Sequence, residues 1–140
     1  MSYSCPKIVT TPPGPKASEL IERDKKLLSG SLTRCAPLVG EKAEGMYIED
    51  PDGNVFLDFG SGIAVTALGH RHPVVVEAIK KQLDKIIFLN SLDYYSPSQV
   101  DYAEQICKLA PGNSEKRIFY TNSGSESVEA AIKIAKAHNR

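Results

Sequence analysis

The sequence lacks several features that would each point to a class of protein. It has no tryptophan, only three cysteines and no excess of one charge, since 17 Lys and Arg residues balance 17 Asp and Glu residues. A formal net charge of zero argues against a basic nucleic-acid-binding protein or a polybasic protein of the membrane surface. No segment approaches the roughly 18 consecutive apolar residues of a transmembrane helix. We therefore expect neither nucleic acid nor membrane among its partners.

Cysteine and histidine spacing argues against a metal site. Cys5, Cys35 and Cys107 lie far apart with no Cys-x-x-Cys pair, which predicts neither a zinc site nor a disulfide framework and favours a reducing cytoplasm. His70 and His72 have no cysteine or third histidine near them in the sequence. We interpret these two histidines as residues at the entry of a helix and expect no metal.

Three sections follow one another along the chain. They are an extended Pro-rich arm over 1–16, a section over 17–72 and a section over 73–140. The arm holds four of the nine prolines and has neither the apolar run of a signal peptide nor an Arg-rich amphipathic pattern. We expect this arm to be poorly packed.

Helical and strand patterns predict elements in both later sections. Apolar spacing predicts a helix over 17–28, and β-prone runs on either side of Asp50–Asn54 predict a hairpin over 46–59, because Pro and Gly suit the tight turn. In the last section we expect a helix from Pro73 to about 87. A second helix begins at a Ser96 capping box and stops at Pro111-Gly112.

The end of the chain has the order strand, turn, helix. Residues 117–121 are β-prone, 122–125 form a polar turn, and apolar positions from Glu126 onward lie on one helical face up to about 138. This order favours an α/β architecture with mixed or parallel pairing. Because one strand cannot form a parallel sheet, its partners are expected outside this segment.

The turn before this last helix is a candidate phosphate site. A helix N-terminus exposes unpaired N–H groups, Gly124 lets a phosphate approach them, and Ser123 and Ser125 add hydroxyl donors. The alternative is that Ser123 and Glu126 form a capping box that needs no ligand. Both interpretations stay open from the pattern alone.

Other motifs add little. Neither Gly-x-Gly-x-x-Gly, nor a Walker motif, nor a Gly-x-Ser-x-Gly elbow is present, so dinucleotide binding, Walker-type nucleotide binding and serine hydrolysis have no local support. Gly60–Gly62 is interpreted as a flexible turn after a strand. Tyr94 and Tyr95 are interpreted as packing residues at the junction of a loop and a helix.

Several ordered motifs between about Glu41 and Arg140 resemble the N-terminal third of class III aminotransferases of the 4-aminobutyrate, acetylornithine and ornithine type. The motifs are Asp50-Pro51-Asp52-Gly53-Asn54, Phe56-Leu57-Asp58-Phe59, Ser61-Gly62-Ile63-Ala64-Val65, Leu68-Gly69-His70-Arg71-His72-Pro73 and Asn122-Ser123-Gly124-Ser125-Glu126-Ser127-Val128-Glu129-Ala130-Ala131. The resemblance implies a fold-type I transferase dependent on pyridoxal 5'-phosphate. In it, 17–72 would supply small-domain elements with the hairpin, and 73–140 the start of the large α/β domain.

The resemblance also implies site residues and partners. Gly124 and Ser125 match positions that bind the cofactor phosphate, with Ser123 as a neighbour, and Ile63 matches a position that lines the substrate pocket. The partners would be an amino donor, a 2-oxo acid acceptor and a second copy of the chain in a homodimer. No residue matches the Schiff-base Lys, which is expected beyond residue 140, so no catalytic residue is assigned. The segment looks like part of a longer enzyme and is expected to be inactive alone.

Three functions remain open at this point. The first is transfer of an amino group from an ω-amino acid such as 4-aminobutyrate to a 2-oxo acid. The second is amino-acid racemisation by an enzyme of the same family, because the two reactions differ in where a proton returns. The third is a non-catalytic short chain that only binds or dimerises, although its apolar faces would then stay uncovered.

Overall fold

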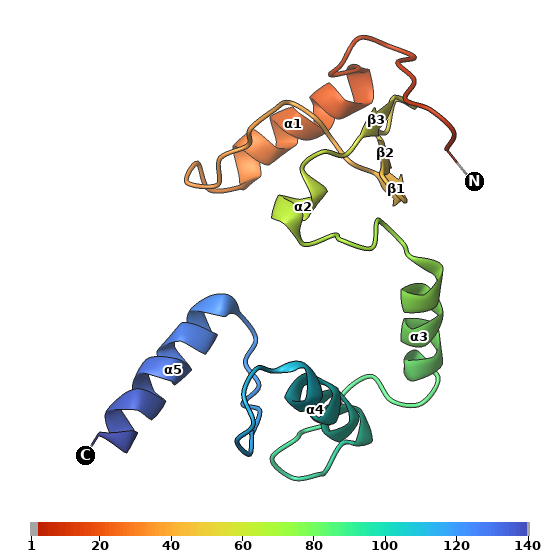
Figure 1. Cartoon of the computed structure of the whole chain (residues 1–140). Helices are drawn as coiled ribbons and strands as arrows, with labels where there is room; N and C mark the ends of the chain where they lie inside the picture. Colours follow the sequence, from red (N-terminus) through yellow and green to blue (C-terminus); the bar gives the residue numbers. More distant parts are fainter. Residues whose placement is uncertain (1–2, 140) are drawn as a thin grey trace. The chain divides into compact units, whose positions relative to one another are not determined.

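The computed structural model describes residues 3–139, so the first two residues of the arm and Arg140 lie outside the described residues. The chain divides into two compact units, Met1–Ile87 and Phe88–Arg140. In chain order the elements are α1 (Pro15–Leu27), β1 (Lys42–Glu44), β2 (Tyr47–Glu49), β3 (Val55–Leu57), α2 (Ser61–Ala64), α3 (Pro73–Leu83), α4 (Pro97–Leu109) and α5 (Gly124–His138), as labelled in Figure 1. No helix among residues 3–139 has both the length and the apolar character that crossing a membrane requires.

A three-stranded antiparallel sheet in the order β1-β2-β3 organises the first unit. Its β2–β3 pair confirms the predicted hairpin, with Ile48 opposite Phe56. Strand β1, which the sequence pattern did not predict, pairs with β2 so that Ala43 lies opposite Ile48. The described strands pair only in antiparallel fashion, so the mixed or parallel pairing expected from the sequence is not formed within this part of the chain.

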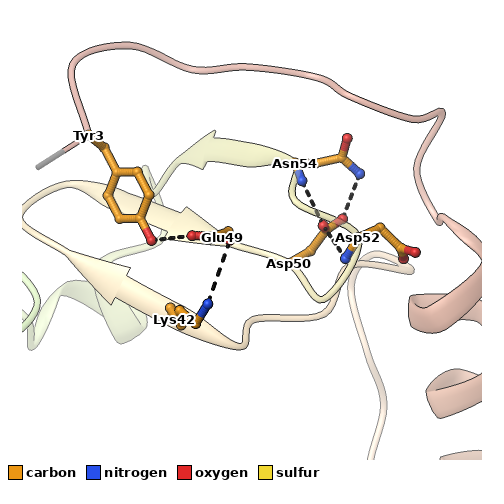
Figure 2. A network of polar contacts seen from close by, with 6 residues as sticks. All are labelled: Tyr3, Lys42, Glu49, Asp50, Asp52 and Asn54. Atoms are coloured by element: carbon orange, nitrogen blue, oxygen red, sulfur yellow. Dashed lines mark hydrogen bonds and ion pairs between the residues drawn. The ribbon is translucent and has the colours of Figure 1, made fainter. Parts of the chain in front are cut away.

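The turn between β2 and β3 is built around a buried carboxylate. Asp50 accepts hydrogen bonds from the backbone amides of Asp52 and Asn54 at 2.9 and 2.8 Å, and from the Asn54 side-chain amide at 2.7 Å (Figure 2). Both Asp50 and Asn54 are almost completely buried. A buried charge is tolerated when hydrogen bonds replace its hydration, and this network supplies them.

The N-terminal arm is anchored to this turn by hydrogen bonds, although most of its described side chains are exposed, as expected of a poorly packed arm. The Asn54 side-chain oxygen accepts from the amides of Val9 and Thr10 at 2.7 and 2.9 Å. Lys7 and Val55 exchange two backbone hydrogen bonds of 2.9 and 2.7 Å. The prolines of the arm have no backbone N–H to donate, but the amides of Lys7, Val9 and Thr10 form hydrogen bonds with the hairpin.

The start of the arm also contacts the sheet. The Tyr3 hydroxyl donates a hydrogen bond to the Glu49 carboxylate, which in turn lies 3.8 Å from the Lys42 ammonium (Figure 2). This hydrogen bond raises the pKa of Tyr3, because the ionised Tyr3 oxygen has no proton to donate to Glu49.

Helix α1 begins two residues before its predicted start because a residue from the hairpin turn caps it. Asp52 accepts from the amides of Lys16 and Ala17 at 3.0 and 2.9 Å, which satisfies donors that a helix N-terminus leaves free. A Cβ on Gly14 would lie 2.4 Å from the Asp52 carboxyl carbon. Gly14 is therefore required for the close approach of helix and turn.

Two helices differ in detail from their expected forms. Helix α3 ends at Leu83 instead of about Ile87, because the amides of Lys85 and Ile86 both turn back to the Gln82 carbonyl at 3.0 Å. Helix α4 stops before Pro111-Gly112 as predicted, but the Ser96 side chain makes no capping hydrogen bond. Pro97 in the first helical turn has no N–H, which reduces the number of donors to be capped.

The predicted strand over 117–121 is not formed in the second unit. These residues have no regular secondary structure as far as the turn that leads into α5, and no strand in the described part of the chain pairs with them. A strand exists through hydrogen bonds to a neighbour, so a β-prone run without a partner stays irregular. Helix α5 itself starts at Gly124, two residues before Glu126, and reaches His138 as expected.

Candidate functional site

The N-terminus of α5 combines a capping arrangement with free donors. Ser123 is the N-cap, and its hydroxyl accepts from the Glu126 amide at 3.3 Å. The Glu126 carboxylate reaches back to the Asn122 amide at 2.6 Å, one residue before the position that a capping box uses. The capping box is thus confirmed for the Ser123 hydroxyl, whereas the Glu126 carboxylate accepts from the Asn122 amide instead of the Ser123 amide.

Capping leaves two backbone donors available. Among the described residues, no hydrogen bond engages the amides of Gly124 or Ser125, whereas the Ser127 amide bonds to the Ser123 carbonyl at 3.0 Å. A Cβ on Gly124 would meet no atom within 4 Å, so the space beside Gly124 is open. Two free amides, the Ser125 hydroxyl and the positive end of the helix dipole together fit a phosphate group.

The turn that carries these donors is held by further hydroxyl contacts. Thr121 and Ser127 hydroxyls lie 2.6 Å apart, and the Ser127 hydroxyl also donates to the Ser123 carbonyl at 3.1 Å. An open groove starts here, with Phe119 and Tyr120 on one side and α5 on the other. Because the turn is already ordered by its own side chains, an anion would find its donors in place.

Ile63 lies in an unusual left-handed turn in the first unit. Four consecutive residues, Ser61, Gly62, Ile63 and Ala64, have φ values of 45°, 60°, 61° and 63°. Left-handed backbone costs an L-residue roughly 1–2 kcal/mol, and a β-branched residue such as isoleucine is a rare occupant. The turn is therefore strained, not the flexible one expected, and it leaves the Ile63 side chain 94% exposed.

Two residues that sequence analysis did not connect hold this turn. Asp58 accepts from the amides of Gly60 and Ser61 at 3.0 and 2.8 Å, and His70 Nε2 donates to its other oxygen at 2.7 Å. The Asp58 side chain is only 12% exposed. No local spacing rule relates residues twelve positions apart on either side of a loop, which explains why the pair was missed.

The partners of Asp58 favour its ionised form. The hydrogen bond from His70 lowers the pKa of the Asp58 carboxyl, the Ser61 and Gly60 amides lower it further, and partial burial opposes them. The charge of Asp58 is thus retained at neutral pH, and the carboxylate acts as a fixed acceptor for both ends of the loop.

Other sequence-based interpretations are corrected. His70 is not a helix-entry residue but the partner of Asp58, whereas His72 does occupy the N-cap position of α3. Tyr95 is 99% exposed and Tyr94 is also exposed, so neither packs under a loop in this chain. Among residues 3–139, no group of three or more His, Cys, Asp and Glu side chains has metal-site geometry.

The structure brings Ser123, Gly124 and Ser125 together at one helix end in the second unit, as the sequence predicted. Ile63 belongs to the first unit, with Asp58 and His70. Each group is therefore a local arrangement within its own unit.

Comparison with protein families gives a single result. The family model described as aminotransferase class-III matches residues 31–140. An alanine/serine racemase of Pyrococcus horikoshii is 44% identical over 138 residues, which cover 96% of this chain and 28% of that protein. An acetylornithine aminotransferase of Caldanaerobacter subterraneus is 40% identical, covering 85% of this chain and 29% of its own. A probable 4-aminobutyrate aminotransferase of Bacillus subtilis is also 40% identical, covering 71% and 23%.

Solved structures agree. Acetylornithine aminotransferase from Elizabethkingia anophelis matches with a TM-score of 0.76 and 30% identity over 85% of this chain and 30% of that one. Taurine:2-oxoglutarate aminotransferase from Bifidobacterium kashiwanohense, a complex with pyridoxal phosphate and glutamate, matches with a TM-score of 0.75 and 30% identity over 86% and 27%. The fold is that of the N-terminal region of these enzymes, whose family is dependent on pyridoxal phosphate. This chain spans less than a third of the length of the relatives it matches.

Proposed function

This chain belongs to the class III aminotransferase family, and we therefore propose that it belongs to a pyridoxal-phosphate enzyme that acts on amino donors. The proposed reaction moves an amino group from an ω-amino acid resembling 4-aminobutyrate to a 2-oxo acid. Support comes from the names of two relatives, an acetylornithine and a probable 4-aminobutyrate aminotransferase, each 40% identical to this chain. We further propose a cytoplasmic homodimer.

One observation carries the proposal: the free amides of Gly124 and Ser125 at the start of α5. We assign the cofactor phosphate to these two amides and the Ser125 hydroxyl, with Ser123 ordering the turn through its cap. When bound there, pyridoxal phosphate would withdraw electrons from the amino-bearing carbon of a substrate and make its proton removable. The residues of this chain bind and orient; none is proposed to carry the proton.

Ile63 is proposed to contact the amino donor. Its side chain is apolar and exposed, so it suits the hydrocarbon part of an ω-amino acid and excludes water beside it. The Ser123–Ser125 turn would act on the cofactor and Ile63 on the donor, which separates cofactor affinity from donor preference.

Phosphate binding can be tested on this chain by following the amide resonances of Gly124 and Ser125. Pyridoxal phosphate and inorganic phosphate should shift both resonances, whereas pyridoxal, which lacks the phosphate, should leave them unchanged. Ser125→Ala removes one charge-assisted hydrogen bond and should weaken binding about tenfold. Ser114→Ala is the matched control, since that exposed loop serine lies outside the turn. Equal responses to pyridoxal and pyridoxal phosphate would contradict the phosphate site.

The reaction itself is tested in the complete enzyme loaded with cofactor. Amino transfer from 4-aminobutyrate that depends on an added 2-oxo acid is expected. Borohydride reduction should add a pyridoxyl-sized mass if the cofactor is bound to a lysine. No 2-oxo acid-dependent turnover with any amino donor would contradict the proposed activity.

Racemisation is the second candidate, because the alanine/serine racemase relative is 44% identical and matches 96% of this chain. The two activities are separated by one incubation. A single pure amino-acid enantiomer is supplied without a 2-oxo acid, and loss of optical purity would favour the racemase over the aminotransferase.

The third candidate, a chain that only binds or dimerises, predicts a different behaviour. Such a chain would be monodisperse and cooperatively folded by itself and would not take up pyridoxal phosphate. Uptake of the cofactor at the α5 N-terminus would contradict this candidate.

A further inference from the structure

The loop 59–69 is closed at its base by Asp58 and His70. The Asp58 amide donates to the Met46 carbonyl at 2.8 Å, and His70 exchanges two backbone hydrogen bonds of 2.8 and 2.9 Å with Gly45. Both ends of the loop are thereby attached to the short turn between β1 and β2. The 2.7 Å hydrogen bond between the His70 and Asp58 side chains joins the two ends directly.

The attachment at this base leaves little freedom. A Cβ on Gly69 would lie 3.0 Å from the Gly45 carbonyl oxygen, and Gly69 has a φ of 80°, so only glycine allows this crossing without strain. The Asp58 carboxylate then fixes where the loop starts, through the amides of Gly60 and Ser61. The left-handed turn begins directly at that anchor.

Residues 59–69 contain no buried side chains that could pack as a core of the loop. None of residues 59–69 is buried, and Phe59 and Ile63 are 92% and 94% exposed. The Asp58–His70 pair therefore does not secure apolar packing within the loop. What it secures is a strained backbone conformation with apolar side chains directed outward, and strained backbone persists only where its surroundings fix it.

We propose that Asp58 and His70 are positioning residues that hold the left-handed turn Ser61–Ala64 and thereby place Ile63 for amino-donor recognition. The proposal rests on the function proposed above, in which Ile63 contacts the donor. Neither Asp58 nor His70 contacts the donor in it. Their role is to keep the Ile63 backbone in a conformation that an unrestrained chain would leave.

The first measurement tests the stability of the turn alone, through amide hydrogen-exchange rates in this chain. The reporting amides belong to Ile63 and Val65, which donate to Gly60 and Ser61 carbonyls at 2.8 and 2.9 Å. His70→Phe keeps an aromatic ring but removes the donor, and it should speed exchange at both amides about tenfold, as expected for loss of a charge-assisted hydrogen bond. His70→Gln restores a side-chain N–H and should return exchange toward the wild-type rate.

The matched control breaks an exposed ion pair in the same unit. Glu77 and Lys80 lie 2.9 Å apart on the surface of α3, so Glu77→Gln removes an ionic contact without touching the loop. Exchange at Ile63 and Val65 should stay at the wild-type rate in this variant. If His70→Phe behaves like Glu77→Gln, the pair does not hold the turn and the proposal is overturned.

The second measurement reads donor recognition in the complete enzyme. His70→Phe should raise KM for the ω-amino donor about tenfold and leave kcat within about twofold, because donor binding is lost equally in the ground and transition states. Ile63→Ala should shift KM in the same direction, and His70→Gln should restore it. A released turn with an unchanged donor KM would overturn the proposal. Absence of amino transfer by the wild-type enzyme would instead overturn the proposed function, and the exchange experiment distinguishes the two failures.

Discussion

The two units of the chain obtain their order in different ways. In the first unit, the buried residues Gly14, Ala17, Asp50, Asn54 and Val55 gather where the arm, the hairpin turn and the start of α1 meet. In the second unit, no described residue is buried, and α4 and α5 keep apolar side chains exposed. Long-range hydrogen bonds to backbone amides thus fix the first unit, whereas the second relies on local helix signals and on exposed contacts such as that of the Tyr120 hydroxyl with the Gln99 carbonyl.

The first unit shows how a small unit can be specified without a large apolar core. Asp52 and Asn54 each accept from two backbone amides of a segment more than 30 residues away in the sequence. Giving these four amides acceptors in this way favours one arrangement of the arm over its alternatives. In the second unit, the segment 115–121 meets α4 through side chains: the Tyr120 hydroxyl donates to the Gln99 carbonyl at 2.5 Å, and the Cys107 thiol donates to the Lys116 carbonyl at 3.6 Å.

The largest effect on this comparison should come from Asn54→Ala. The substitution removes the acceptor for the Val9 and Thr10 amides and a partner of buried Asp50, so we expect the free energy of opening the arm to fall by about 3 kcal/mol. Hydrogen exchange at the Val9 and Thr10 amides measures this directly. Asn90→Ala, in an exposed turn of the second unit, is the matched control. Unchanged protection of the arm would contradict its anchoring by Asn54.

A smaller effect is expected from Gly14→Ala. The added Cβ would lie 2.4 Å from the Asp52 carboxyl carbon and would displace the cap of α1, which should destabilise the first unit by about 1–3 kcal/mol. Gly30→Ala is the matched control, because a Cβ there meets nothing within 4 Å. Amide exchange at Lys16 and Ala17 reports the cap. Equal exchange in the two variants would show that turn and helix can separate at no cost.

Elements that depend on neighbours in the sequence were the ones that the sequence predicted well. The helix starting at Pro73, the stop before Pro111 and the hairpin around Pro51-Gly53 all rest on local rules for proline, glycine and apolar spacing. The α5 N-terminus belongs to the same group, because Ser123 and Glu126 signal a cap within four residues. The helix end that carries the candidate phosphate site was therefore predictable, whereas phosphate binding by its residues stays a prediction.

Features that depend on distant partners were missed. The sequence does not show that Asn54 binds the arm or that His70 binds Asp58, because each side chain finds its acceptor or donor across a loop. The opposite error occurred at 117–121, where a β-prone run predicted a strand that no described neighbour pairs. Local composition predicts the secondary structure that a segment prefers, whereas the tertiary fold determines which partner the segment pairs with.

In the second unit we expect a milder and more local response, to Ser123→Ala. Loss of the N-cap hydroxyl should cost about 1 kcal/mol and fray the first turn of α5, without a wider change, since no buried network depends on it. Faster exchange at the Glu126 amide and a small loss of helical circular dichroism would show it. Ser114→Ala, in an exposed loop of the same unit, should leave both unchanged. A loss of order throughout the unit would break the contrast between the two units.

The smallest effect should be the acid response of the Asp58–His70 pair in the first unit. Because hydrogen bonds from His70, Ser61 and Gly60 lower the pKa of Asp58 below its ordinary 3.8, the pair contributes fully at neutral pH and is lost only as pH falls through that lowered pKa. The Ser61 amide resonance should therefore titrate with a midpoint below 3.8. Asp58→Asn, which has no carboxyl group, should abolish this titration. A midpoint above 3.8 would mean that burial outweighs the three donors, and the loop would then be held by its backbone contacts to Gly45 and Met46 instead of by the carboxylate.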